Sequence, residues 1–302
     1  MTQAESRDVA VVIVGRNARE YVRECLESLA AAMWRDVTRE TVYVDNESTD
    51  GTVEMVAERF PYVRRIVNDA NIGFCKAANQ GARAADARHY MFINDDTVVL
   101  DDAIALLVEY MDAHPEVVTA GSRLLNTDGT EQWSGRRFPR IADAIVGRRS
   151  PLARLFPNAR GLREYLCKDQ LESGEPFDVD WVSAAGQIVR RDAFWRAGGY
   201  AEDYYYWHEA VFCDRLRAAG GRVVLHPLSR IVHHEGKGSG ARPFKVQRFH
   251  ILDFHRGAFR CYCEHHRLGR LHPMRWLAAA ALTARAACLL GAAGVASLRV
   301  RR

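Results

Sequence analysis

The first 114 residues of the chain alternate between short apolar runs and longer amphipathic runs, and this alternation constrains the fold more than any other feature. The apolar runs have strand length and are rich in β-branched residues: VAVVIV (9–14), TVYVD (41–45), VRRIVN (63–68) and YMFIND (90–95). The runs that follow them have helical periodicity: 20–33, 52–60, 74–85 and 102–114. Strands that are apolar almost throughout are buried on both faces. The sequence therefore predicts an α/β fold, in which a Rossmann-like, mostly parallel sheet carries helices on both faces.

Polar side chains stand where two of these predicted strands end. Asp45 closes the second strand, and Asn94, Asp95 and Asp96 close the fourth. In open α/β sheets, ligands bind beyond the carboxyl ends of the strands. Carboxylates at such an edge suit Mg²⁺ or Mn²⁺, which prefer oxygen ligands and keep positions open for phosphate. The alternative is that this acidic run only caps the following helix, which we expect to begin near Asp101.

Two turns beside these strand ends are candidates for nucleotide contacts. Asp45 and Asn46 offer acceptor and donor groups to an edge such as that of a pyrimidine, although a turn and a helix cap would use the same residues. The run NIGFCKAANQGA (71–82) places Gly73 in a turn and Lys76 in the first turn of a predicted helix. The start of a helix with a nearby lysine suits a phosphate or a ribose.

After about residue 120 the alternation fades, and the chain becomes rich in turns and arginine. We expect 145–175 to be irregular, 187–200 to form a strand and a short helix, and 222–227 to form another strand. Arg136 and Arg137 could hold a phosphate of a lipid-linked acceptor, or they could belong to a solvated basic loop. The run VHHEGKGSG (232–240) places His233 where it could complete a metal shell, ahead of a loop that could fold over a diphosphate.

Composition narrows the class of protein. The chain has 302 residues, 48% of them hydrophobic, which is enough for one large domain or two modest ones. The formal net charge of +4 is too small to favour nucleic acid as a partner. Seven cysteines are an odd number in a chain of this size, and the pair Cys261 and Cys263 has no second pair at metal-site spacing. We therefore expect neither a disulfide framework nor a zinc site, and a reducing cytoplasm fits best.

The last long apolar stretch, 276–302, is dominated by alanine and is interrupted by Arg285. We therefore expect it to be a poor membrane-spanning helix. It could lie on a membrane surface, where the closing RVRR (299–302) would suit an anionic leaflet, or it could pack on the domain. At the other end of the chain, the first apolar run is too short and too β-branched for a signal peptide.

Taken in order, these runs resemble glycosyltransferase family 2, and within it the bacterial rhamnosyltransferase-like and galactofuranosyltransferase-like members. The resemblance covers residue 9 to about residue 240, roughly four-fifths of the chain. It rests on VAVVIVGRN, VYVDNESTDGT, NIGFCKAANQG, YMFINDDT, GTEQWSGRRFP, FDVDWVSAAGQIVRRDAFWRAGGYAEDYYYWHEAVFCDRLRAAGGRV and IVHHEGKGS. The resemblance implies a GT-A fold, a nucleotide-sugar donor and a divalent metal, Mg²⁺ or Mn²⁺.

The resemblance also implies roles for particular residues. Asp45 lies where the family binds the base, and Asn94 and Asp96 lie in its metal-and-diphosphate motif, with Asp95 between them. Asp96 matches the direct metal ligand, and His233 matches a histidine that completes the metal shell in some members. Asp180 and Trp181, which open DWVSAAG (180–186), match a segment that lines the sugar and acceptor pocket.

Glu209 is the residue on which catalysis depends in this interpretation. The family usually carries a Glu-Asp pair here, and alignment on Cys213, Arg215 and Gly220 places His208 and Glu209 on that pair. Glu209 then replaces the aspartate that acts as base, and His208 replaces the acid before it. An inverting transfer needs a carboxylate to take the proton from the acceptor hydroxyl, and glutamate can do so. Alternatively, Glu209 is an ordinary first-turn glutamate.

The sequence as a whole predicts a GT-A domain over 1–245, with a nucleotide-binding half (1–120) and an acceptor-binding half (121–245), followed by a helical segment over 246–302. We expect an inverting, metal-dependent glycosyltransferase that moves a sugar, such as rhamnose, from a dTDP- or UDP-linked donor to a cell-surface glycan or a polyprenyl-diphosphate-linked acceptor. The alternative is a relative that binds nucleotide sugars without turnover. The expected location is cytoplasmic, at the inner face of the plasma membrane if the last helix touches it.

Overall fold

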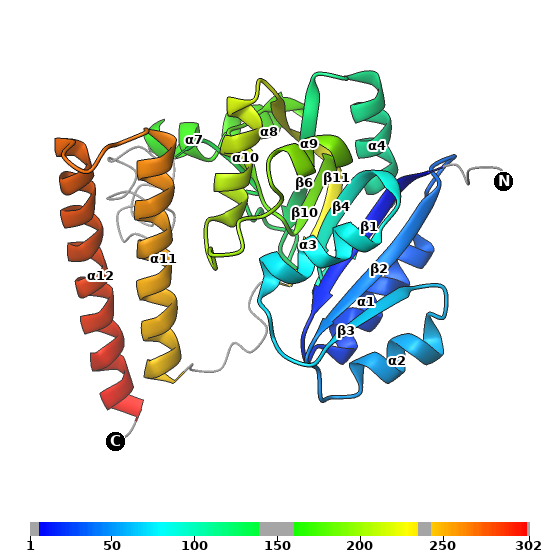
Figure 1. Cartoon of the computed structure of the whole chain (residues 1–302), viewed down its shortest axis with the longest axis horizontal. Coiled ribbons are helices and arrows are strands. Elements are labelled where there is room, and N and C mark those ends of the chain that lie inside the picture. Colours follow the sequence, from blue (N-terminus) through cyan, green and yellow to red (C-terminus); the bar gives the residue numbers. More distant parts are fainter. Residues whose placement is uncertain (1–5, 139–159, 235–242, 301–302) are drawn as a thin grey trace.

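The computed structural model describes residues 6–138, 160–234 and 243–300, and the structural statements below concern these residues. Nine strands form one sheet in the order β3-β2-β1-β4-β10-β6-β11-β5, with β8 paired to β11 (Figure 1). They are β1 (Arg7–Gly15), β2 (Arg39–Asn46), β3 (Arg64–Asn68), β4 (Ala87–Asn94), β5 (Thr97–Val99), β6 (Val117–Leu125), β8 (Phe177–Asp178), β10 (Gly186–Arg190) and β11 (Arg222–His233). β7 (Gly135–Arg136) and β9 (Trp181–Val182) form a separate two-stranded ribbon.

The sheet is mixed but mostly parallel. β3, β2, β1 and β4 run parallel to one another, and β11 runs parallel to β6 with a shift of register between His226 and Arg230. β10, β5 and β8 are antiparallel to their neighbours. The carboxyl ends of β1, β2 and β4 consequently lie at one edge, where Gly15 is in register with Asp45.

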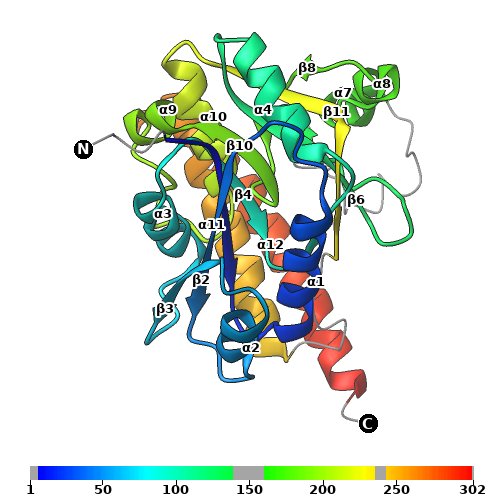
Figure 2. The same cartoon turned by 90° about the vertical axis from the view of Figure 1, so that its right-hand side faces the viewer.

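Helices cover both faces of the sheet. They are α1 (Arg19–Ala31), α2 (Thr52–Arg59), α3 (Phe74–Ala84), α4 (Ala103–Ala113), α7 (Arg160–Tyr165), α8 (Lys168–Ser173), α9 (Arg191–Arg196), α10 (His208–Ala218), α11 (Phe244–His265) and α12 (Pro273–Val300). Figure 2 shows α1 and α3 on opposite sides of β1. Val11 and Ile13 of β1 face the core with α1 and α4, whereas Ala10 and Val12 face the core with α3, α9 and α10. This alternation explains why β1 is apolar throughout.

The predicted α/β fold is confirmed, and most predicted elements begin and end within about three residues of the observed ones. Two expectations need correction. The acidic run at 94–96 does not cap the next helix, because β5 intervenes and α4 begins at Ala103 after Asp102. The region 145–175 is not wholly irregular, since α7 and α8 form within its described part. The predicted divisions at residues 120 and 245 stay predictions.

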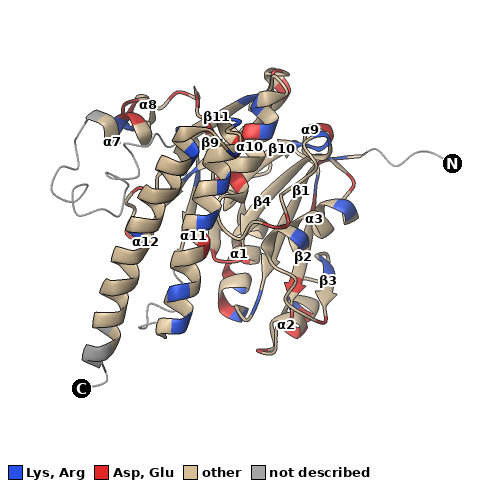
Figure 3. Cartoon of the chain, turned by 60° about the vertical axis from the view of Figure 1, so that its left-hand side comes forward, with Lys and Arg blue, Asp and Glu red and all other residues tan. Residues whose placement is uncertain are grey.

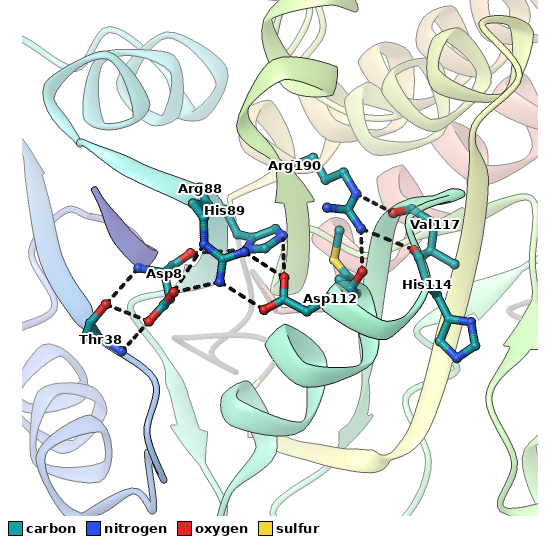
Figure 4. Close-up of polar contacts among 9 residues, drawn as sticks. Asp8, Thr38, Arg88, His89, Asp112, His114, Val117 and Arg190 are labelled. Atoms are coloured by element: carbon teal, nitrogen blue, oxygen red, sulfur yellow. Dashed lines mark hydrogen bonds and ion pairs between the residues drawn. The ribbon is translucent and has the colours of Figure 1, made fainter. Parts of the chain in front are cut away.

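The amino ends of β1 and β4 are joined by a dense ionic network (Figure 4). Arg88 donates to Asp8 at 2.6 Å and to both carboxylate oxygens of Asp112 at 2.8 and 2.9 Å. Asp8 also accepts from the backbone and the hydroxyl of Thr38. Burial alone would raise the pKa of Asp8, but the hydrogen bonds from Thr38 and Arg88 lower it to about 2. His89 lies beside this network, and burial lowers its pKa to about 4.

The last two helices, α11 and α12, are antiparallel and lie side by side at one flank of the sheet (Figures 1 and 3). α11 also packs on α10 and on the loop before it. The indole of Trp207 donates to the carbonyl of Phe254 at 3.1 Å, and the Tyr206 hydroxyl lies 2.9 Å from His250 Nδ1. Gly257 permits this approach, because a Cβ there would lie 3.0 Å from the Trp207 ring. α11 therefore connects α12 to the segment that carries His208 and Glu209.

Candidate active site

Asp45 is held in a buried position at the end of β2. One carboxylate oxygen accepts from the Tyr43 hydroxyl at 3.1 Å, and the other accepts from the backbone of Ser48 at 2.8 Å. Asp95 lies close by, since a Cβ on Gly15 would contact both Tyr43 and the Asp95 carboxylate. Burial, together with the charges of Asp45 and Asp95, raises the pKa of Tyr43 well above its usual range. Tyr43 is thus a proton donor fixed between two carboxylates.

Asn46 organises the turn before α3. Its carbonyl oxygen accepts from the backbone of Ile72 at 3.2 Å, and its amide nitrogen donates to Asn71 at 3.1 Å. The turn leads into Gly73, which has a φ of 84° and precedes the first residue of α3. Lys76 is exposed in the first turn of that helix. The structure therefore brings four of the predicted donor-binding residues, Asp45, Asn46, Gly73 and Lys76, to one region beside the ends of β1 and β2.

Asn94, Asp96 and His233 converge where β4 and β11 end. His233 Nε2 lies 3.3 Å from Asp96 Oδ1 and 3.1 Å from the amide nitrogen of Asn94. The backbone of His234 donates to the Asp96 carbonyl at 2.9 Å, which ties the end of β11 to the turn after β4. These contacts join residues that are more than 130 positions apart in the sequence.

Gln132 fixes which nitrogen of His233 carries the proton. The Gln132 amide nitrogen is 2.5 Å from the His233 carbonyl and 2.9 Å from Asn126 Oδ1, which are both acceptors, so this end of the amide is the NH₂ group. The other end is therefore the oxygen, and it lies 2.8 Å from His233 Nδ1. Nδ1 must donate to it, so in the neutral imidazole the lone pair is on Nε2, the nitrogen that faces Asp96 and Asn94. Sequence analysis did not identify Gln132.

The arrangement has the features of half a metal shell. A carboxylate oxygen and the imidazole Nε2 face one another, and a buried amide orients the imidazole, as outer partners of metal-bound histidines do. Among the described residues, no group of three or more His, Cys, Asp or Glu side chains could hold a metal by itself. The glycine-rich loop predicted to cover a diphosphate, with Lys237 and Ser239, lies outside the described residues.

Glu209 lies in the first turn of α10, and its side chain is 20% exposed. His208 Nδ1 is 3.5 Å from Glu209 Oε2 and 3.3 Å from the Tyr205 carbonyl. The Tyr205 carbonyl is an acceptor, so Nδ1 carries the proton and donates to it, with the Glu209 carboxylate close by. The His208 ring packs against Phe74 of α3 and Tyr200, with ring centroids 5.1 and 5.5 Å apart. His208 thereby links the start of α10 to the start of α3.

The predicted pocket residues of the β7–β9 ribbon separate into two groups. Trp181 lies beside Trp207, with ring centroids 6.2 Å apart, and the guanidinium of Arg136 covers its other side at 4.6 Å. Asp180, the residue before it, accepts from the backbone of Phe138 at 2.7 Å.

Asp180 also pairs with Arg217 at 3.2 Å and with Arg137 at 3.5 Å. Arg137 and Arg217 line a pocket of about 400 Å³ at the far end of α10, together with Asp178 and Arg222. Glu209 lies at the opposite end of this helix, about 12 Å away along its axis. Asp180 and Arg137 are therefore not brought together with Glu209, whereas Trp181 lies near the loop before it.

Comparison with known proteins places this site in a family. Residues 10–196 match the family described as Glycosyl transferase family 2. A relative from Mycobacterium tuberculosis (strain H37Rv), N-acetylglucosaminyl-diphospho-decaprenol L-rhamnosyltransferase, is 28% identical over 279 residues, which are 88% of this chain and 87% of the relative.

Two solved structures have a similar fold. The mannosyltransferase PcManGT from Pyrobaculum calidifontis, in complex with GDP-Man and Mn²⁺, aligns with a TM-score of 0.58 and 19% identity over 98% of this chain and 81% of its own. GalNAc-T7 with UDP, GalNAc and Mn²⁺ aligns with a TM-score of 0.59 and 16% identity over 82% of this chain, which spans about half (48%) of that protein. These likenesses show a GT-A fold. Since the family match covers well over half of its length, the chain belongs to glycosyltransferase family 2 and is a glycosyltransferase.

Proposed function

We propose that the protein is an inverting, metal-dependent glycosyltransferase that moves a sugar from a nucleoside-diphosphate donor to a glycan or lipid-linked acceptor. The observation that carries this proposal is the pairing of Asp96 with an oriented His233 Nε2 at the carboxyl edge of the sheet. The position of Glu209, at the start of α10, supports it.

Asp96 and His233 fit a divalent cation, Mg²⁺ or Mn²⁺, because a carboxylate oxygen and an imidazole nitrogen that can both be ligands face one another 3.3 Å apart. Both structural neighbours described above are complexes with Mn²⁺. When bound, the ion would neutralise the charge that builds up on the diphosphate leaving group. Gln132 holds His233 in the required tautomer, and Asn94 holds the ring in place from the other side.

Glu209 takes the proton from the acceptor hydroxyl as that oxygen attacks the sugar carbon. Its carboxylate is only partly exposed, so it can reach a substrate and remain shielded from bulk water. His208 Nδ1 lies 3.5 Å from the Glu209 carboxylate and is held by the Tyr205 carbonyl, while the Phe74 and Tyr200 rings fix the imidazole. His208 thus takes the place of the acid that the family usually carries before its base.

Asp45 and the Asn46-ordered turn form the base and ribose side of the donor site, and Lys76 at the start of α3 faces the phosphates. The donor is a dTDP- or UDP-linked sugar, with rhamnose favoured by the name of the mycobacterial relative. That name also contains a diphospho-decaprenol, which favours a polyprenyl-diphosphate-linked acceptor. Trp181 is buried beneath the guanidinium of Arg136, so its contribution to the acceptor pocket would be to support Arg136.

A thermal-shift titration tests the donor and metal sites without knowledge of the acceptor. The wild type, Asp96→Asn and the control Asp192→Asn, an exposed aspartate on α9, are each titrated with dTDP, UDP and GDP, with and without Mn²⁺. We expect one pyrimidine diphosphate to stabilise the wild type and the control by about 2.7 kcal/mol at one hundred times its dissociation constant, only with Mn²⁺. The Asp96→Asn variant should lose this effect. Absence of a shift with every nucleotide would overturn the proposed donor site.

A further inference from the structure

α12 presents a continuous uncharged face to the outside of the molecule. Its stretch Pro273–Val295 is long and apolar enough to cross a membrane, and only 11% of that stretch is buried. The exposed positions of this stretch contain no charge, and many of them repeat every three or four residues: Trp276, Leu277, Ala280, Thr283, Ala284, Ala287, Cys288, Gly291 and Val295. Trp276 is 64% exposed and Leu277 is 53% exposed. Figure 3 shows α12 almost without charged residues beside the charged α11.

The two cations within that stretch are turned away from this face. Arg285 donates to His255 Nε2 of α11 at 3.1 Å, and its guanidinium lies 5.9 Å from the Phe254 ring. Arg275 donates to the Leu268 carbonyl and lies 5.1 Å from the ring of Phe259. The charge that interrupts the apolar sequence is therefore placed between the two helices, which leaves the outer face of α12 apolar.

The packing of α12 on α11 determines whether α12 can span a membrane or can only lie on its surface. α11 lies along α12 and carries charges throughout its length, including Lys245, Arg248, Asp253 and Arg256. It is also attached to the catalytic loop through Trp207. If α12 crossed a bilayer in this arrangement, α11 would be drawn into hydrocarbon, where each charge costs roughly 2.5–3.5 kcal/mol. The packed pair is therefore compatible with a position in the membrane plane and not with a span.

The charge around this face matches an anionic surface. Residues 273–295 contain no acidic residue, and neither do the first two turns of α11. Lys245 and Arg248 are exposed in those turns, and no carboxylate within the described part of the chain pairs with either. Phe244, at the start of α11, lies 3.9 Å from where a Cβ of Gly294 would be, so these cations lie near the end of α12.

We propose that the α11–α12 pair binds in the plane of an anionic lipid bilayer, with the outer face of α12 in the headgroup region and Lys245 and Arg248 at the lipid phosphates. Because α11 is attached to the loop before Glu209, this binding would hold the active site at the leaflet surface. A lipid-linked acceptor would then meet the enzyme without leaving the membrane. The proposal does not depend on which sugar or nucleotide is used.

Vesicle co-sedimentation of the full chain tests this surface. The vesicles are phosphatidylcholine alone and phosphatidylcholine with roughly 30% phosphatidylglycerol, each at low and high salt. The anionic lipid gives the second kind of vesicle a negative surface potential. We expect binding to the anionic vesicles, weakened by salt. Lys245→Glu with Arg248→Glu should lower the partition coefficient about thirtyfold or more, at about fivefold for each cation lost. Alkaline carbonate should release the bound protein, as expected for a helix that does not span.

Leu277→Glu tests the apolar face, and it should reduce vesicle binding at least about tenfold. Leu228→Glu is the matched control, since Leu228 is 61% exposed on β11, and it should bind as the wild type does. Circular dichroism and nucleotide-induced thermal shifts confirm that each variant is folded. Equal loss in both leucine variants, failure of the wild type to bind either vesicle, or a stable dimer that Leu277→Glu dissociates would overturn the proposal. The last result would identify a second copy as the occupant of this face.

Discussion

At the amino ends of β1 and β4, two carboxylates face one arginine, whereas at the carboxyl ends of β2 and β4 the carboxylates are held by neutral donors and a histidine. Asp8 and Asp112 are both hydrogen-bonded to Arg88. Asp45 accepts from Tyr43 and a backbone amide, and Asp96 faces His233. The two edges are about 25 Å apart along the strands. The amino edge has its charges compensated and contributes to stability, while the carboxyl edge leaves room for a cation from outside.

This contrast separates two kinds of experimental effect. Changes at the carboxyl edge should alter binding and turnover with little change in the free energy of unfolding. Changes at the amino edge should do the opposite, because no donor or acceptor site is proposed there. The predictions below test these two expectations, and the last of them measures both properties in one variant.

Glu209→Gln should produce the largest effect. We expect turnover to fall about a thousandfold, within the usual range for loss of a general base, while the affinity for the nucleotide and Mn²⁺ stays within twofold of the wild type. Transfer from donor to a polyprenyl-diphosphate-linked acceptor in detergent measures the first quantity, and calorimetry measures the second. Glu202→Gln removes another carboxylate of the same segment, one that accepts from Asn79, and should retain turnover. Turnover within threefold of the wild type in Glu209→Gln would exclude it as the base.

His89 should make the amino edge sensitive to mild acid. Burial lowers its pKa to about 4 from an ordinary 6.5, with Asp112 opposing this shift and Arg88 and Arg190 adding to it. Between pH 6.5 and pH 4 the unfolded chain therefore binds a proton that the folded chain does not. Stability should fall by about 3 kcal/mol as pH drops through this window.

Denaturant unfolding at pH 7.0, 5.5 and 4.5 measures this loss. His89→Gln should remove most of the slope, whereas His114→Gln, which changes an exposed histidine of the same network, should leave it intact. A wild-type slope that His89→Gln does not reduce would assign the acid sensitivity elsewhere.

Gln132→Leu should weaken the metal site and leave the amino edge intact. Without the Gln132 oxygen, His233 can move its proton to Nε2, and the Mn²⁺ affinity measured with a nucleoside diphosphate should fall about 10- to 100-fold. Nitrogen NMR of histidine-labelled protein reports the His233 tautomer directly, before metal is added. Gln132→Glu keeps an acceptor for Nδ1 and should keep the wild-type tautomer. If Gln132→Leu left both the tautomer and the affinity unchanged, Gln132 would have no role in orienting the ligand.

The parallel half of the fold could be predicted from the sequence because its strands are apolar on both faces and its helices are periodic. The same reasoning predicted that Asp45 and Asp96 lie at the carboxyl edge of the sheet, because the end of each apolar run marks the end of a strand. The secondary structure after residue 120 could be predicted less completely. The Arg-rich stretch that forms α7 and α8 carries no clear period, and each helix has only six residues.

Gln132 could not have been found in this way, because it lies 101 positions from His233 and meets it only through the pairing of β6 with β11. For Asp180 the difficulty was that two residues adjacent in the sequence have different surroundings in the structure. The resemblance groups it with Trp181, but the neighbouring side chains diverge, and Asp180 is turned toward Arg217 at the other end of α10. The end of a strand can be predicted from one segment of sequence. A residue that orients a ligand from a distant segment can be identified only when the order of the strands in the sheet is known.

Arg88→Met should have the smallest effect, and it tests the contrast most sharply. The guanidinium is 45% exposed, so solvent screens its pairs with Asp8 and Asp112, and we expect a loss of about 1 kcal/mol in the free energy of unfolding at pH 7. The loss should shrink below pH 4, where the unfolded chain protonates its aspartates and the low pKa of Asp8 ceases to favour the folded state. Arg196→Met, which removes an exposed pair on α9, is the matched control and should cost less. Nucleotide and Mn²⁺ affinities should not change in either variant. A fall in those affinities with Arg88→Met would mean that the two edges are coupled through β1 and β4, and that the amino edge positions the site as well as stabilising the fold.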